Sequence, residues 1–235
     1  MIGTDPSARM ITQAQATTTE SNVSFRPGKA EDLDFLEDGS LDFVSAAQAS
    51  HWFDYSKVWP VLSRKLRKGG TLAFWGYKDN YFVEYPRATK VLDHYCYTLG
   101  VGLMGEFWEQ PGRNILRDKL REIVPPSEAF EDVERIEYEP DVKGRASGVG
   151  EVLMARDMML GEMEGYVRTF SAYTNWMDAN PGKKARKDGG EGDVVDDMFD
   201  EMLRVEPEWA SEGERWREKV VASEWGSAIL MARKR

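Results

Sequence analysis

Two short stretches of the sequence hold most of the residues that could bind or transform a small molecule. They are residues 47–53 and 77–81, and each follows a short apolar run. Both are rich in His, Trp, Tyr and Gln, where a loop with a purely structural role would carry Gly, Asn and Ser. We therefore expect them to line a small-molecule site. His51 could orient or deprotonate a substrate near neutral pH, and a histidine hydrogen-bonded within its own loop is the alternative.

Metal and covalent chemistry have little support in the sequence. His51 and His94 are the two histidines, Cys96 is the single cysteine, and neither histidine lies at ligand spacing from a cysteine or carboxylate. A Gly-x-Ser-x-Gly phrase, which could present a serine nucleophile to His51 and Asp54, is absent from the sequence. We predict no metal site and no Ser-His-Asp triad.

Aromatic and arginine side chains are the candidates for recognising the substrate. Trp52, Tyr77 and Trp108 could form an aromatic pocket for an apolar or sulfonium group, and each could instead belong to the core. Arg113 and Arg168 could each bind a carboxylate through both arms of the planar guanidinium, and each could instead pair with a nearby glutamate. The sequence leaves both alternatives open for all five residues.

The element that must position these residues is a β-α-β unit over residues 40–77. Residues 41–44 and 71–75 are apolar runs typical of strands buried in a parallel sheet. Between them, apolar residues at helical spacing predict a helix that ends at Gly69 and Gly70. These apolar residues are Tyr55, Val58, Trp59, Leu62 and Leu66. Parallel strands joined in this way bring the loops that follow them to one edge of the sheet, where open α/β sheets bind ligands.

Length, charge and cysteine content restrict the class of protein. A chain of 235 residues can bury one sizeable α/β core with an inserted cap. A formal net charge of −10 argues against a nucleic-acid partner. The single Cys96 excludes an internal disulfide and suits a reducing compartment. Because no apolar run reaches the ~18 residues of a membrane span, we expect a cytoplasmic protein without a membrane partner.

The rest of the chain alternates strands and helices. We expect a strand at 1–4, a helix opened by Asp5, Pro6 and Ser7, and a second strand at 23–26. The other predicted elements are helices at 85–99, 114–123, 154–179 and 194–205, strands at 130–138 and 220–232, and a mobile loop at 180–193.

Four phrases spread over the chain carry a family resemblance. They are AEDL at 30–33, AAQASHWFD at 46–54, LRKGGTLAFWGY at 66–77 and YVRTFSAY at 166–173. Together they resemble the class I S-adenosylmethionine-dependent methyltransferases, and within them the fungal branch similar to trans-aconitate methyltransferase. The resemblance implies a Rossmann-like α/β sheet with helices on both faces and a helical cap insert.

The resemblance also implies S-adenosylmethionine as the cofactor and places its contacts. In this family an acidic residue that ends the second strand holds the ribose hydroxyls, and Asp5 occupies that place; a helix N-cap is the alternative. The turn after the next strand meets the adenine ring, here through Ala30 and Glu31, while a solvated helix start is the other interpretation of Glu31. Lys29 stands where many relatives carry an acidic residue. Gln48 lies in the phrase beside the cofactor.

The implied activity is methyl transfer to a small-molecule acceptor, a carboxylate such as trans-aconitate. The candidate catalytic residue is His51. The candidate substrate-binding residues are Trp52, Tyr77, Trp108, Arg113 and Arg168. The implied domain organisation is a partial cofactor-binding core at 1–77, a helical cap insert at 78–129 and the remainder of the core at 130–235.

The first central strand of the family, with its glycine-rich turn, has no counterpart in this sequence. That strand would lie between the strands at 1–4 and 41–44, so we expect a chain truncated at its N-terminus that binds S-adenosylmethionine weakly or not at all. The alternative function is a catalytically inactive remnant or regulatory subunit that keeps the fold. A nicotinamide oxidoreductase would need the same absent turn.

Overall fold

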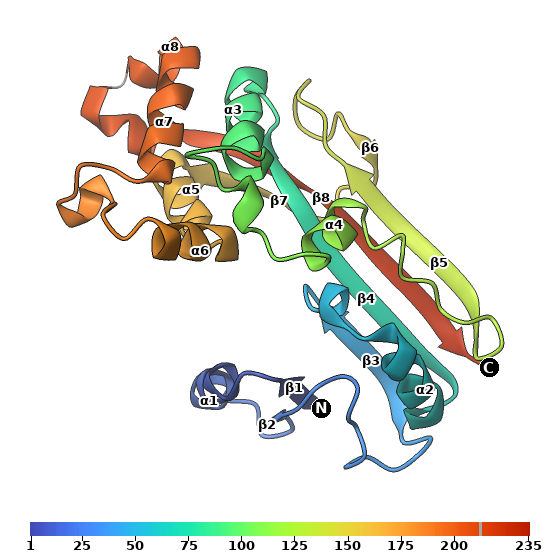
Figure 1. Cartoon of the computed structure of the whole chain (residues 1–235). Coiled ribbons are helices and arrows are strands. Elements are labelled where there is room, and N and C mark those ends of the chain that lie inside the picture. The colour runs from blue at the N-terminus through green and yellow to red at the C-terminus, as the bar shows by residue number, and fades with distance from the viewer. Residues whose placement is uncertain (212) are drawn as a thin grey trace. The chain divides into compact units, whose positions relative to one another are not determined.

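A computed structural model describes residues 1–211 and 213–235 of the chain. The chain divides into two compact units. Unit 1 comprises Met1–Trp75, Glu122–Arg135 and Ile229–Arg235, and unit 2 comprises Gly76–Arg121 and Ile136–Ala228. Three long strands contribute residues to both units. They are β4 (Leu66–Phe82), β5 (Phe130–Glu139) and β8 (Val220–Lys234) (Figure 1).

Unit 1 contains the predicted β-α-β unit. Its elements besides the long strands are β1 (Ile2–Asp5), α1 (Ala8–Thr17), β2 (Ser24–Pro27), β3 (Leu41–Ala47), the 3-10 helix η1 (Ser50–Trp52) and α2 (Tyr55–Lys65). Strand β3 pairs with β4 in parallel, and β1 pairs with β2 in parallel as a separate two-stranded sheet. The predicted strands at 1–4, 23–26, 41–44 and 71–75 are therefore confirmed. Among the described residues, β1 and β3 do not pair with each other.

Helix α2 packs on the β3–β4 pair through the predicted apolar stripe. Val58 and Leu62 are buried, and Trp59 stacks on Phe74 of β4 with ring centroids 6.0 Å apart. Burying a side chain of this size stabilises the fold by roughly 1.5–3 kcal/mol. Asp54 begins the helix by accepting a hydrogen bond from Ser56 N. This packing fixes the loop between β3 and α2.

The prediction that Gly69 and Gly70 end this helix is wrong. Helix α2 ends at Lys65, and the glycines lie inside β4, where the register with β3 shifts between Leu41 and Phe43. Gly69 adopts a left-handed φ of 74°. A Cβ on Gly70 would lie 2.9 Å from Arg67 O. The pair of glycines therefore forms a bulge in the strand.

The first helix begins later than the sequence suggested. Ser7 is its N-cap and accepts from Met10 N, and the helix begins at Ala8. Pro6 thus lies before the first turn. Asp5 is not the N-cap; its carboxylate accepts from Ser7 N at 2.7 Å.

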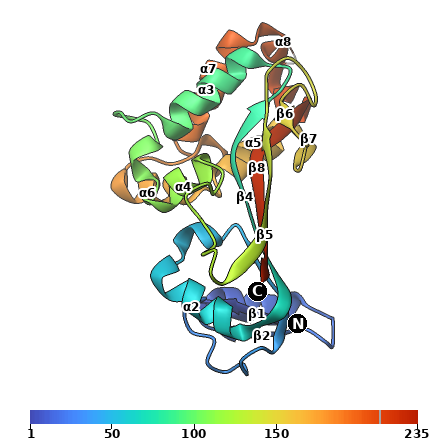
Figure 2. The ribbon, with the colours of Figure 1, turned by 90° about the vertical axis from the view of Figure 1, so that its right-hand side faces the viewer.

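Unit 2 is mostly helical and holds a large hydrophobic core. Its helices are α3 (Pro86–Tyr97), η2 (Gly105–Phe107), α4 (Gly112–Arg117), α5 (Leu160–Val167), α6 (Ser171–Ala179), η3 (Arg186–Asp188), α7 (Val194–Val205), α8 (Pro207–Ala210) and η4 (Gly213–Glu218). Its short strands are β6 (Val149–Gly150) and β7 (Ala155–Met159). Helix α3 packs along α7 (Figure 2). The helices predicted at 85–99 and 194–205 are confirmed.

The larger sheet is mixed. Its strand order is β3-β4-β8-β5-β6, and β7 pairs with β8 in antiparallel orientation. The predicted strands at 130–138 and 220–232 are confirmed as β5 and β8. Parallel and antiparallel pairs in one sheet, with helices packed on it, confirm the predicted α/β class.

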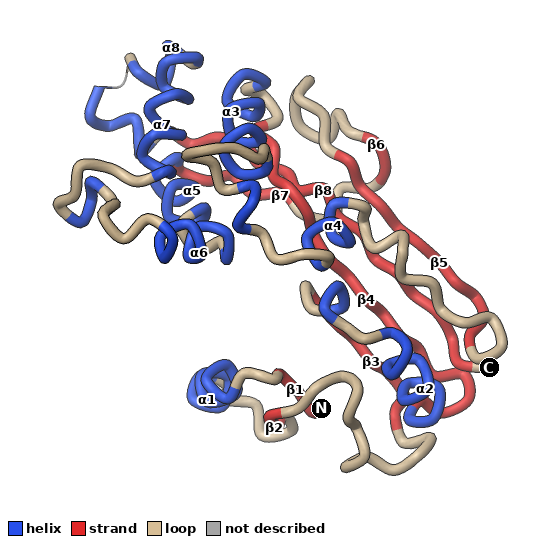
Figure 3. Tube along the Cα trace, in the orientation of Figure 1, coloured by secondary structure: helices blue, strands red, loops and turns tan. Residues whose placement is uncertain are grey.

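Three predictions in unit 2 are wrong. Residues 77–81 continue β4 instead of forming a loop. The helix predicted at 114–123 is α4, which ends at Arg117 because Lys119 and Leu120 adopt left-handed φ angles of 55° and 60°. The predicted helix at 154–179 is divided into strand β7 and helices α5 and α6 (Figure 3). Residues 155–159 become a strand because β8, a partner distant in sequence, pairs with them.

Candidate cofactor and acceptor sites

A cavity of about 590 Å³ in unit 1 brings together residues chosen from the sequence. Its volume lies within the ~300–1,000 Å³ typical of small-molecule sites. The lining residues are Asp5, Pro6, Lys29, Ala30, Glu31, Gln48, Ala49, Trp52, Phe53, Asp54 and Lys57. Asp5, Ala30, Glu31 and Gln48, the candidates for holding a cofactor, all line it. Trp52, a candidate for the substrate, lines the same cavity.

The cavity lies where strands of unit 1 end. Asp5 is the last residue of β1, Ala30 and Glu31 follow β2, and Gln48 follows β3. Parallel strands direct their carboxyl ends to a common edge, and ligands of α/β sheets bind there. Trp52 reaches the cavity from η1, and it is half exposed.

Two carboxylates of the cavity are held by backbone donors. Asp5 accepts from Ser7 N at 2.7 Å, and Glu31 accepts from Asp54 N at 2.8 Å. The second bond ties the turn after β2 to the start of α2. An ionised carboxylate has about four acceptor positions, so each retains capacity to accept from a ligand.

Gln48 lies at a strained point of the backbone. Its φ is 50°, a left-handed value that residues other than glycine rarely adopt, and its N–H donates to Trp75 O at 2.9 Å. Strain of this kind costs of order 1–3 kcal/mol and clusters at functional sites. The position of Gln48 on the cavity wall agrees with that tendency.

Two lysines lie on the cavity wall, and one of them, Lys57, was not predicted there. Lys57 forms an ion pair with Asp54 at 2.7 Å, and its hydrogen bond holds the pKa of Asp54 below the usual value. Lys29 lies on the same wall. The signal for Lys57 was its place three residues after an aspartate that begins a helix, which sets the pair on one side of the first turn.

His51 is buried, in contrast to its neighbour Trp52. The two rings lie 4.7 Å apart, and His51 is 7% exposed. Trp52 lines the cavity, whereas His51 does not. The imidazole of His51 therefore contacts Trp52 from the interior of the protein and not from the cavity.

The unit 2 candidates Tyr77, Trp108 and Arg113 belong to one aromatic cluster. The Arg113 guanidinium lies 4.3 Å from the Trp108 ring centroid, and Trp108 packs on Phe170 with ring centroids 5.4 Å apart. Phe170 contacts Tyr166 at 5.0 Å, and Tyr166 is hydrogen-bonded to Tyr77. The structure thus joins residues that are up to 93 positions apart in the sequence, from Tyr77 to Phe170.

Tyr166 is the hydrogen-bonding centre of this cluster. Trp225 Nε1 donates to its hydroxyl at 3.2 Å. Burial raises the pKa of Tyr166, so the phenol keeps its proton at neutral pH. It therefore does not act as a base.

Arg113 is held by a buried carboxylate. Its Nη2 donates to Asp79, which also accepts from Arg117 Nε at 3.0 Å. The guanidinium of Arg113 lies 4.6 Å from the ring centroid of Tyr97 as well as close to Trp108. Its Nε is buried and donates to no atom of the described residues.

Arg168 lies in a different environment from Arg113. It caps the C-terminus of α5 and pairs with Glu164 at 2.8 Å, Asp193 at 3.0 Å and Asp196 at 2.9 Å. Tyr173 also donates to Asp193. Among the described residues, Arg168 makes no hydrogen bond, ion pair or ring contact with the aromatic cluster.

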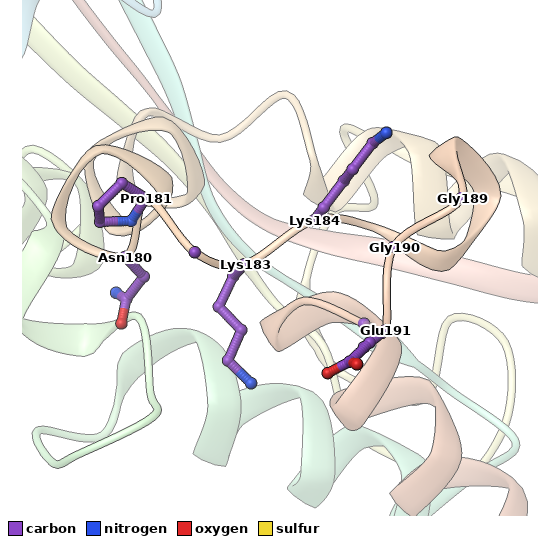
Figure 4. A pocket seen from close by; sticks show the side chains of 9 residues that line it. Asn180, Pro181, Lys183, Lys184, Gly189, Gly190 and Glu191 are labelled. Carbon is purple, nitrogen blue, oxygen red and sulfur yellow. The ribbon is translucent and has the colours of Figure 1, made fainter.

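A second cavity, of about 560 Å³, lies within the loop predicted at 180–193. Lys183 and Lys184 extend to opposite sides of the chain, and Glu191 shares the cavity (Figure 4). The loop closes on itself through a bond from Gly192 N to Lys184 O at 3.1 Å. Diverging lysines do not make a convergent anion site, and the mobility of this loop stays a prediction.

Similarity to known proteins shows the family of this chain. Residues 1–74 match the methyltransferase domain family. The chain is 30% identical over 216 residues to the probable S-adenosylmethionine-dependent methyltransferase CRG1 of Saccharomyces cerevisiae, an alignment that covers 87% of this chain and 70% of that protein. The chain belongs to the S-adenosylmethionine-dependent methyltransferases. This confirms the predicted family and makes S-adenosylmethionine its cofactor.

Further relatives agree with that assignment. A Dictyostelium discoideum protein named as a methyltransferase is 27% identical over 206 residues, and the chain spans 65% of its length. A solved structure from Anaeromyxobacter dehalogenans, assigned as a type II methyltransferase, aligns with 99% of this chain and 79% of its own, at a TM-score of 0.65 and 23% identity. That likeness shows the same fold. Among the described residues, no helix has the length and apolar character to cross a membrane.

The donors and acceptors of the unit 1 cavity suit the adenosine part of the cofactor. Ribose hydroxyls and the adenine amino group need acceptors, and Asp5 and Glu31 supply carboxylates on the wall. Trp52 and Phe53 supply aromatic faces for a planar base. The cavity residues therefore fit the cofactor that the family requires.

Proposed function

We propose, against the sequence-based expectation of weak or absent cofactor binding, that this methyltransferase holds S-adenosylmethionine in the unit 1 cavity and transfers the methyl group to a small-molecule carboxylate. The observation that carries the proposal is the meeting of Asp5, Ala30, Glu31 and Gln48 on one wall. Asp5 accepts from the ribose hydroxyls. Glu31 and the backbone of Ala30 bind the adenine amino group and ring, and Gln48 borders the cofactor.

The chain's own contribution to the reaction is alignment. S-adenosylmethionine supplies an electrophilic methyl group on a sulfonium. The protein orients the acceptor oxygen and excludes competing water, and such positioning accounts for a large part of catalysis in bimolecular reactions. His51 orients the acceptor in this scheme through Trp52 on the cavity wall, which its ring contacts, and a carboxylate acceptor brings no proton for it to remove.

The acceptor class rests on the resemblance to trans-aconitate methyltransferase and on the chemistry of unit 2. Within unit 1 we assign acceptor recognition to Trp52, and within unit 2 we assign it to Tyr77, Trp108 and Arg113. Arg113 supports this because its Nε–H is without an acceptor in the described residues. Arg168 is assigned a stabilising role instead, because three carboxylates already occupy its guanidinium. A cytoplasmic location stays a prediction, supported by the single, buried Cys96.

A methyl-transfer assay tests this proposal. The chain is incubated with S-adenosylmethionine and trans-aconitate, and the products are separated and identified by mass spectrometry. We expect a methyl ester of trans-aconitate together with S-adenosylhomocysteine. Formation of neither product by a chain that binds the cofactor contradicts the acceptor class while leaving the cofactor site in place.

A further inference from the structure

Asp79 is a buried carboxylate shared by two arginines. Its side chain is 4% exposed, and Arg113 and Arg117 approach it from successive turns of α4. A buried carboxylate needs a charged partner, because an unpaired one costs several kcal/mol. One arginine is enough to neutralise it. The second, Arg117, is 40% exposed and also lies 3.4 Å from Asp93, so the buried pair is that of Arg113 and Asp79.

The orientation of Arg113 follows from this pairing. Asp79 takes Nη2, and the flat guanidinium lies over the rings of Tyr97 and Trp108. Nε is buried and has no acceptor among the described residues. An unsatisfied buried donor costs roughly 1–3 kcal/mol, so an incoming acceptor atom is favoured there.

We propose that Asp79 is a positioning residue for the methyl acceptor, fixing Arg113 so that its Nε–H donates to a carboxylate of the acceptor. This inference rests on the proposed function of the aromatic cluster. The Nε–H of Arg113 attracts an acceptor oxygen, and the neighbouring aromatic rings favour an acceptor with a planar, unsaturated body. Because Trp108 covers the guanidinium, acceptor binding must change the environment of its indole.

The test measures binding of trans-aconitate to the ¹⁵N-labelled chain, followed by the indole N–H signal of Trp108 and by calorimetry. The variants are Asp79→Asn, Asp79→Glu, Arg113→Lys and the double variant Asp79→Asn with Arg113→Lys. The control is Glu206→Gln, because Glu206 is a buried carboxylate that pairs with Arg87 and lies outside the cluster. The trimethyl ester of trans-aconitate is the uncharged probe.

We expect Asp79→Asn and Arg113→Lys each to raise the dissociation constant for trans-aconitate about tenfold, with no further loss in the double variant. Asp79→Glu should restore part of the affinity because it keeps the charge. Glu206→Gln should lower stability and leave the affinity unchanged, and the trimethyl ester should not bind.

Two outcomes separate this inference from the proposed function. If Arg113→Lys weakens binding while Asp79→Asn does not, or if the two effects add, Asp79 is not a positioning residue and the acceptor role of Arg113 stands. If trans-aconitate binds neither the wild type nor any variant, the proposal of a carboxylate acceptor is wrong. Should Asp79→Asn fail to fold, Asp79→Glu replaces it alone and together with Arg113→Lys, and losses that add in this pair overturn the inference.

Discussion

Arg113 and Arg168 are both buried, but their guanidinium groups have different donor capacity left for a ligand. Arg168 makes four hydrogen bonds, to Glu164, Asp193 and Asp196. Arg113 keeps a buried Nε–H without an acceptor among the described residues. The carboxylates that distinguish them lie 25 and 34 positions away, at Asp193 and Asp79. The sequence named both arginines but could not show which one was already occupied.

Replacing Arg168 tests its assignment as a stabilising residue. Arg168→Lys keeps the charge but loses the fork that reaches three carboxylates, so we expect the free energy of unfolding to fall by roughly 3 kcal/mol. Urea unfolding measures this. The matched control is Arg64→Lys, whose exposed pair with Asp34 should change stability by less than about 1 kcal/mol. If Arg168→Lys leaves stability unchanged and raises the KM for the acceptor, Arg168 binds the substrate and the stabilising assignment is wrong.

At the scale of elements, the carboxylates around Arg168 couple helices α5, α6 and α7. Glu164 lies on α5, Tyr173 on α6, and Asp193 caps α7. Burial acts to raise the pKa of Asp193, but hydrogen bonds from Arg168 and Tyr173 outweigh it and hold the pKa below its usual 3.8. The pKa of Glu164 is likewise lowered from 4.5, because Arg217 and Arg168 offset the effect of its burial.

These lowered pKa values predict the pH dependence of stability. A carboxylate with a lower pKa in the folded state binds fewer protons there than in the unfolded chain, so acidification favours unfolding. The contribution is complete above about pH 5 and should be lost as the pH falls below 4. Urea unfolding between pH 7 and pH 3 should show the decline, with a shallower decline in Arg168→Lys. Parallel pH curves for the two proteins would contradict the coupling.

The elements also show which patterns the sequence could predict. Local periodicity and capping signals located α2, α3 and α7, and the parallel β3–β4 pair followed from its apolar runs. Residues 155–159 were misassigned because their strand depends on β8, more than 60 residues away. Gly70 was misread because the need for glycine comes from close backbone atoms, including Leu41 O, and not from a helix end.

The candidate cofactor residues were placed by the family resemblance, and the structure gives a physical reason why they meet. Each of them ends or follows a strand of unit 1, and a parallel arrangement gathers such positions at one edge. Lys57 was not predicted because charged residues in the first turn of a helix are usually solvated. The aromatic cluster of unit 2 was predicted only as separate residues, because Tyr166, which joins Tyr77 to Phe170, is placed by tertiary packing.

For the molecule as a whole, charge agrees with the cofactor. The chain carries a net charge of −10, and the unit 1 cavity has three carboxylates, those of Asp5, Glu31 and Asp54, against two lysines. An acidic cavity in an acidic protein attracts a cationic sulfonium and holds the hydroxyl groups of a ribose. The central claim of this account is therefore that S-adenosylmethionine binds in this cavity with Asp5 on its ribose.

The most direct test is a titration of the ¹⁵N-labelled chain with S-adenosylmethionine, followed by the indole N–H signal of Trp52, which lines the cavity. The signal is assigned with Trp52→Phe, and Asp34→Ala, an exposed aspartate outside the cavity, is the control. We predict a saturable shift, with the dissociation constant raised about 5- to 150-fold in Asp5→Ala, the effect of about 1–3 kcal/mol for unpaired hydroxyls, and unchanged in Asp34→Ala. A Trp52 signal that does not move, or an Asp5→Ala curve that overlays the wild type, would contradict the account.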